Sequence, residues 1–155
     1  MKRSALVITI FLTAFAHLSF AQDKQTQQLL SDYYNIKDAL VAGNANVAAA
    51  KAGDFIKTLN GIDYKVISEG NVNVLLKDAG KIAESNDLNK QRVVFSNFSD
   101  NVIAVAKAVK LSDKEIYLQY CPMKKASWLS SEKGIKNPYY GSSMLTCGSV
   151  KETLK

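Results

Sequence analysis

Hydrophobic residues recur at spacings of three and four over most of the chain, and this period predicts amphipathic helices. The predicted helices cover about 25–41, 47–59, 71–84 and 88–109, with turn and capping residues between them. The inward-facing positions of the first and last helices are Leu29, Tyr33, Ile36, Leu40, Phe95, Phe98, Val102, Val105 and Val109. Four such helices with short connections predict an antiparallel, up-and-down four-helix bundle.

The pattern changes near residue 113. Ile116, Leu118 and Tyr120 alternate with polar residues, as in a short strand or extended segment. The rest of the segment 113–150 is rich in Gly, Pro, Ser and aromatic residues and shows no helical period. We therefore predict an all-α fold, in which this segment packs on the bundle as a long ordered loop. A loop of this length in a compact domain is usually functional or cross-linked.

The N-terminus has the form of a secretory signal peptide. The basic pair Lys2 and Arg3 precedes a mostly apolar run, and residues 19–21 fit the small-x-small pattern of a cleavage site. Residues 1–21 are therefore predicted to be removed, leaving 22–155 as a single exported domain, periplasmic or secreted. No second long apolar run follows, so no membrane span is expected in the mature protein.

Charge and histidine content narrow the function classes. Without the predicted signal peptide, the 20 basic residues fall to 18, against 14 acidic residues. The basic residues are scattered, so nucleic-acid binding is not predicted. The only histidine, His17, lies in the predicted signal peptide. The exported domain then lacks histidine, which is the usual general base and a common zinc ligand. It also contains no base–nucleophile pair that would indicate an enzyme.

Sulfur is confined to two short stretches of the predicted exported domain. Cys121 and Met123 form one stretch, Met144 and Cys147 form the other, and Met1 is the only other sulfur-containing residue. Thiolate and thioether sulfur are soft ligands, so these four residues predict a site for Cu(I) or Ag(I). The alternative is a disulfide between Cys121 and Cys147, as is common in small exported domains, which would stabilise the fold by about 3–4 kcal/mol. The disulfide and the reduced metal site could also be two states of one protein.

Aromatic and polar residues lie between the two sulfur stretches. Trp128, Tyr139 and Tyr140 are expected to pack the loop onto the bundle; the alternative is that they shield a metal site from water. Asn137, which precedes a proline, is expected to bind backbone groups in a turn. Arg92 is interpreted as a solvated surface residue, with the fixing of a loop or a carboxylate as the alternative.

The C-terminal motifs resemble those of a bacterial domain of unknown function. That domain occurs in exported proteins of Gram-negative bacteria and is also found appended to periplasmic adaptor subunits of copper/silver efflux pumps. The resemblance covers essentially the whole exported domain, and its C-terminal block is the specific part. It implies a metal-handling context, with a periplasmic efflux adaptor or another envelope protein as partner, and no particular mechanism. The motifs are Tyr120-Cys121-Pro122-Met123, Trp128-Leu129, Asn137-Pro138-Tyr139-Tyr140-Gly141 and Met144-Leu145-Thr146-Cys147-Gly148.

Together these observations predict a non-enzymatic periplasmic protein that binds Cu(I) or Ag(I) in copper or silver handling. The alternative is a disulfide-stapled helical interaction module that docks on an envelope or efflux partner without metal. Both interpretations require the loop to fold back and bring the two cysteines together, with Cα atoms within about 7 Å for a disulfide. We expect an extended segment at 120–123, a helical turn at 143–147 and all four sulfur atoms in one region. In a metal site both methionine sulfurs should face the cysteines, whereas in a staple they should enter the core.

Overall fold

The computed structural model describes residues 24–155. The predicted signal peptide at 1–21 lies outside the described residues, so its cleavage and the export of the chain stay predictions. Within the described part, no helix combines the length and the apolar character that a membrane span requires.

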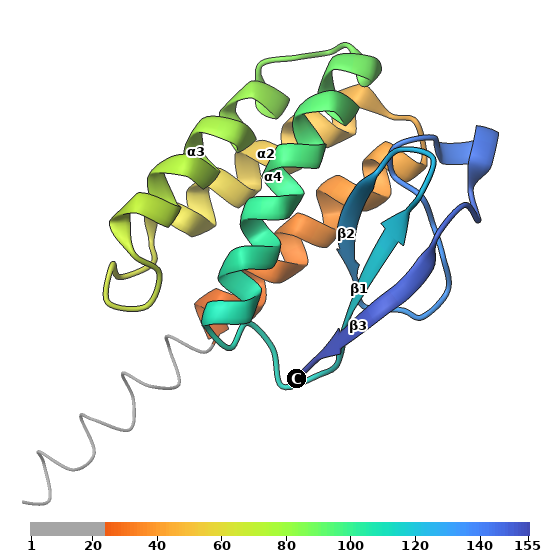
Figure 1. Cartoon of the computed structure of the whole chain (residues 1–155). Helices are drawn as coiled ribbons and strands as arrows, with labels where there is room; N and C mark the ends of the chain where they lie inside the picture. Colours follow the sequence, from red (N-terminus) through yellow and green to blue (C-terminus); the bar gives the residue numbers. More distant parts are fainter. Residues whose placement is uncertain (1–23) are drawn as a thin grey trace, which may run out of the picture.

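Four α-helices lie in the described part of the chain, where the hydrophobic period predicts them (Figure 1). The first helix covers residues 24–41 and is followed by α2 (Ala45–Asn60), α3 (Glu69–Ala83) and α4 (Leu88–Ala108). Short connections reverse the chain between them, and α3 packs against both α2 and α4. The prediction of four helices is therefore confirmed.

Polar caps determine where two of these helices begin. The Asn44 side chain accepts a hydrogen bond from the Val47 N–H at 3.1 Å, at the start of α2. Asp87 does the same for the Asn89 N–H at 2.9 Å, at the start of α4. Each cap satisfies a backbone N–H that has no partner within its helix, which makes these starts readable from the sequence.

The C-terminal segment overturns the all-α prediction, because it forms a three-stranded antiparallel sheet and not a long loop. The strands are β1 (Ile116–Cys121), β2 (Ala126–Ser130) and β3 (Ser149–Leu154), in the order β2-β1-β3. The first two form a hairpin, in which Leu118 pairs with Leu129. The protein therefore has a mixed α/β fold, with the sheet lying on one side of the helices (Figure 1).

The two strands that flank β1 carry weak sequence signals, which explains the error. All but one residue of β2 is buried, so the strand shows no alternation of apolar and polar side chains. Five of the six residues of β3 are exposed, so that strand has no buried face to mark in the sequence. Only β1 carries a partial alternation, and a single short strand cannot form a sheet without partners.

A buried tyrosine joins the sheet to the helices. The Tyr33 hydroxyl, on the first helix, lies 2.6 Å from the Ser99 hydroxyl of α4 and accepts a hydrogen bond from the Leu129 N–H of β2 at 3.0 Å. Its ring stacks on Phe95 of α4, with centroids 5.6 Å apart, and Phe95 in turn contacts Tyr139. Burial raises the pKa of Tyr33 far above its ordinary value, so this hydroxyl stays neutral. One core therefore serves both layers.

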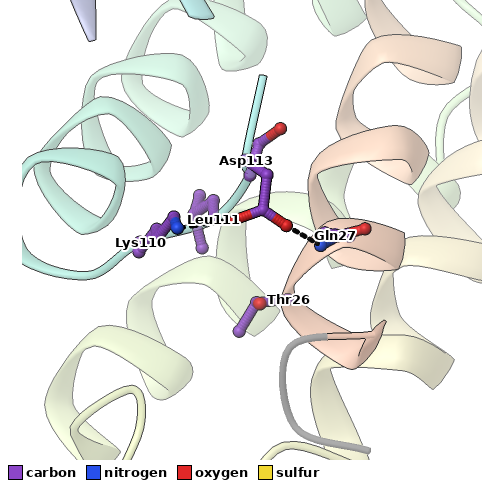
Figure 2. A pocket seen from close by; sticks show the side chains of 6 residues that line it. Thr26, Gln27, Lys110, Leu111 and Asp113 are labelled. Carbon is purple, nitrogen blue, oxygen red and sulfur yellow. Dashed lines mark hydrogen bonds and ion pairs between the residues drawn. The ribbon is translucent and has the colours of Figure 1, made fainter. Parts of the chain in front are cut away.

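The connection between α4 and β1 is attached to the first helix. Asp113 accepts a hydrogen bond from the Gln27 side chain at 3.1 Å and pairs with the Lys110 ammonium at 2.6 Å. Figure 2 shows these side chains. The Lys110 ammonium lowers the pKa of the Asp113 carboxyl. The hollow beside these residues has a volume of about 10 Å³, roughly the space for one water molecule, so we assign it no ligand.

Candidate dithiol site

The two cysteines meet at one end of the sheet. Cys121 is the last residue of β1 and is fully buried, whereas Cys147 precedes β3 and is half-buried. Their Sγ atoms lie 3.1 Å apart, and both residues are free thiols. The structure thus brings together the two residues that the sequence singles out, although they are 26 positions apart.

Strand pairing produces this contact. Tyr120 pairs with Ser149 across β1 and β3. Cys121 directly follows Tyr120 and Cys147 lies two residues before Ser149, so both cysteines fall at the same end of the ladder. Beyond Cys121, residues 122–125 form the hairpin turn, in which Lys125 has a positive φ of 54°. Pro122 has no N–H for a ladder, which suits the position where β1 ends.

The two thiols differ in acidity. Burial raises the pKa of the Cys121 thiol, but hydrogen bonds from Cys147, the backbone of Lys124, the Asn137 side chain and the backbone of Met123 outweigh burial and lower the pKa below its ordinary value. The hydrogen bond to Cys121 is the main cause that raises the pKa of Cys147, and burial adds to it. These shifts favour the thiolate form at Cys121, with the Cys147 thiol as its hydrogen-bond donor.

Asn137 holds the loop around the cysteines. Its side chain is fully buried, and its Nδ2 donates to the Cys147 carbonyl at 2.7 Å while its Oδ1 accepts from the Tyr139 N–H at 2.9 Å. Its own N–H donates to the Leu145 carbonyl at 2.8 Å. Asn137 thus connects the turn at 137–139 to the segment 145–147 and fixes the backbone of Cys147, in agreement with its predicted turn role.

The aromatic residues pack the loop onto the rest of the fold, as the simpler interpretation predicts. Trp128 is fully buried and contacts Tyr139 edge-on, with ring centroids 6.0 Å apart, and the Tyr139 hydroxyl donates to the Ser127 carbonyl at 2.6 Å. Tyr140 is half-buried against the same core. The indole N–H of Trp128 has no hydrogen-bond partner among the described residues. Whether these rings also shield a metal stays a prediction.

The methionines are placed differently from the cysteines. Met123 lies in the hairpin turn with 68% of its surface exposed, so the predicted extended segment ends at Cys121 and not at Met123. Met144 is half-buried at the end of a 3-10 helix, η1 (Gly141–Met144). The Cys147 N–H donates to the Met144 carbonyl at 3.1 Å, which gives the predicted helical turn. Met123 therefore does not enter the core, and metal ligation by Met123 and Met144 stays a prediction.

Arg92 corrects a further expectation. It is not a freely solvated surface residue, because its Nε donates to the Pro138 carbonyl at 3.0 Å and its terminal nitrogen donates to the Leu40 carbonyl at 2.9 Å. Burial lowers the pKa of its guanidinium. Gly141, with φ of 56°, lies so close that a Cβ there would be 2.5 Å from the guanidinium. Arg92 therefore fixes the loop that follows Asn137, which was the less favoured interpretation.

A metal ion at this site would have few ligand types available. The described residues contain no group of three or more His, Cys, Asp or Glu side chains that could hold a metal ion. Any ion here would therefore depend on the two cysteine sulfurs, with thioether or backbone groups as additional donors. Sulfur donors of this kind are the ones that soft ions prefer.

Comparison with known proteins places the helical part of the chain in a family. A family model described as a protein of unknown function, DUF3347, matches residues 29–114, which is more than half of the chain. The match ends before β1, so all four sulfur residues lie outside it, and the copper and silver context suggested by the C-terminal motifs does not come from this match. No curated protein and no solved structure matches the chain.

Proposed function

We propose, from the premise that this chain belongs to the DUF3347 family of proteins of unknown function, that it is a non-enzymatic soft-metal carrier. In its reduced form it would bind one Cu(I) or Ag(I) ion through Cys121 and Cys147. The observation that carries the proposal is the 3.1 Å contact between two thiols, one of which has a lowered pKa.

The chemistry of the pair supports a soft ion. The thiolate is the form that ligates metals, and the Cys121 environment favours it. Monovalent copper and silver accept as few as two sulfur ligands, so the absence of a third His, Cys, Asp or Glu at the site is compatible with them. Zn²⁺ in structural sites takes four ligands, which this pair does not provide.

Binding requires a small opening of the pair. Two metal–sulfur bonds of about 2.3 Å each place the sulfurs about 4.6 Å apart in a linear site and about 3.8 Å apart in a tetrahedral one. The observed separation is 3.1 Å, so one sulfur must move outward. Cys147 is the one able to move, because it is half-buried and follows an exposed stretch at 145–146. Its movement would also open the path by which the ion enters.

The cellular role that we propose is copper or silver handling in the envelope, with a periplasmic efflux adaptor as partner. This part rests on the resemblance of the C-terminal motifs and on the predicted signal peptide. It is tested separately, by asking whether the metal-loaded protein transfers Cu(I) to a purified adaptor or forms a complex with it in size-exclusion chromatography.

Anaerobic titration of the reduced protein with Cu(I), in competition with a chromogenic chelator, tests the binding itself. We expect one ion per chain, and complete loss of competition in the Cys121→Ser/Cys147→Ser double variant. Equal competition by the double variant and the unchanged protein would sink the proposal.

Two methionine substitutions test whether a thioether contributes to Cu(I) binding in this titration. Met123 is largely exposed, so Met123→Leu should leave the free energy of unfolding unchanged while removing a thioether beside Cys121. If Met123 is a third ligand, the affinity for Cu(I) falls in this variant by about tenfold, the loss expected for one ligand interaction of about 1.4 kcal/mol. Met144→Leu is the matched variant beside Cys147.

A second candidate function is a disulfide-stapled interaction module without metal. The same contact favours it, because 3.1 Å is shorter than any separation that a shared ion would impose. A thiol count on protein purified from its exported location distinguishes the two. Two reactive thiols support the carrier, whereas no free thiol, with a count that mild reductant leaves unaltered, supports the staple.

A further inference from the structure

The two sulfurs of the dithiol are unequally accessible from outside. Cys121 has no exposed surface, and its strand partner Ala126 and the loop residue Asn137 are buried beside it. Cys147 is half-buried, and its neighbours Thr146 and Ser149 are exposed. A molecule that approaches the pair from solvent therefore reaches the Cys147 sulfur first.

Cys121 is also enclosed by the chain around it. The turn backbone of Met123 and Lys124 and the fully buried Asn137 side chain lie against its sulfur, so in a disulfide Cys121 would be the inner sulfur. Cys147 contacts Cys121 through its own sulfur at 3.1 Å. The Cys147 sulfur is thus placed to be attacked, and the Cys121 sulfur is placed to be the leaving group.

We infer that this pair is a thiol–disulfide exchange site, in which external thiols react at Cys147 and Cys121 is the resolving residue. The inference rests on the proposed function, since it describes how the same two ligands would be made available to a metal or withdrawn from it. The chemical class of its reaction partner is a thiol of a small molecule or of a dithiol reductase.

The exchange balances as follows. In the oxidised protein, an external thiolate attacks Cys147 Sγ, a mixed disulfide forms between the two, and the Cys121–Cys147 bond breaks with its electron pair on Cys121 Sγ. A second external thiolate then attacks the external sulfur of the mixed disulfide, so that Cys147 leaves as a thiolate and an external disulfide forms. Two external thiols are oxidised and the protein disulfide is reduced to a dithiol. The reverse sequence closes the pair again.

This order of attack matters for the metal. The closed disulfide has no thiolate, so it offers no soft ligand pair. The first exchange frees Cys121, and the second frees Cys147 and completes the pair. Because attack occurs at the outer sulfur, a partner can open the pair without unfolding the sheet end that buries Cys121. The site would then load metal only where a suitable thiol is present.

The test uses the reduced protein and dithiobis(nitrobenzoate), an aromatic disulfide, without any metal. The unchanged protein with one equivalent should release two thionitrobenzoate anions and retain no adduct, because Cys121 resolves the mixed disulfide on Cys147. Cys121→Ser should release one anion and keep a stable adduct on Cys147. Cys147→Ser should react at least about tenfold more slowly, since its remaining thiol is buried, and the difference should vanish in urea.

Two results would overturn the inference: an adduct that persists on the unchanged protein, or equal rates for the two single variants under native conditions. If a variant does not fold, a substoichiometric amount of iodoacetamide on the native unchanged protein decides, with Cys147 as the expected label and Cys121 as the refuting one. These arms contain no metal ion. A failed Cu(I) titration would therefore refute the proposed function and leave the exchange standing. A persistent adduct on the unchanged protein would refute the exchange and leave the proposed metal binding standing.

Discussion

At the scale of single residues, the dithiol depends on a glycine that lets the chain pass close to a tryptophan. Gly148 follows Cys147 and has φ of 150°, a conformation that side chains rarely adopt. A Cβ at this position would lie 2.8 Å from the end of the Trp128 ring and 3.0 Å from the Tyr120 carbonyl. Gly148 therefore lets the Cys147 segment lie against β1, where Cys121 ends the strand.

Gly148→Ala should destabilise the protein by about 2–4 kcal/mol, because it combines an unfavourable φ with overpacking against Trp128. Urea unfolding followed by tryptophan fluorescence measures the loss. The matched control is Gly134→Ala, since nothing lies within 4 Å of a Cβ built there. Equal stability of the two variants would show that the close approach at Gly148 has no energetic importance.

At the scale of elements, one arginine on α4 joins two parts of the fold that lie far apart in the sequence. Arg92 donates to the Leu40 carbonyl near the end of the first helix, where a cation is favoured by the helix dipole, and to the Pro138 carbonyl in the loop before η1. The loop that Arg92 holds contains Asn137, which in turn holds Cys147. The helical layer therefore positions the dithiol indirectly.

Arg92→Met should cost about 2–3 kcal/mol of stability, because it keeps the aliphatic stem and removes the donors of two charge-assisted hydrogen bonds. Arg92→Lys should recover only part of this, since one ammonium cannot reproduce the planar guanidinium. Chemical denaturation measures both variants. Lys90→Met on the same helix is the control, because the Lys90 side chain is 78% exposed and should contribute little. A cost for Arg92→Met no larger than that of the control would contradict the linking role.

At the scale of the whole molecule, the dithiol connects two parts of the C-terminal sheet region that lie far apart in the sequence. It joins the end of β1 to the segment before β3 and encloses β2, the loop with Asn137 and η1. A bond here would restrict the unfolded chain over a loop of 26 residues while leaving the helices untouched. The oxidation state of the pair should therefore change stability as well as metal binding.

Oxidation should raise the free energy of unfolding by about 3 kcal/mol through the lost entropy of the unfolded chain. The measurement is the urea midpoint of the unchanged protein with and without reductant. The Cys121→Ser/Cys147→Ser variant serves as the control, and its midpoint should not respond to reductant. Identical midpoints for the oxidised and reduced protein would mean that the pair does not close in the native state.

Local pattern alone was sufficient for the four helices and for the choice of sulfur residues. A helix satisfies its hydrogen bonds within one segment, so its apolar period and its caps, such as Asn44 and Asp87, are written into contiguous sequence. The confinement of Cys121 and Cys147 to the C-terminal segment is likewise visible without a structure.

The sheet, the contact between the thiols and the role of Arg92 depended on tertiary structure. A strand obtains its hydrogen bonds from another strand, so β2, which is almost wholly buried, and β3, which is almost wholly exposed, have no signal of their own. The 3.1 Å between the cysteines follows from the register of β1 with β3, which joins residues 29 to 38 positions apart. Arg92 contacts carbonyl groups 46 and 52 positions away, and backbone carbonyls carry no mark in the sequence that could indicate such a partner.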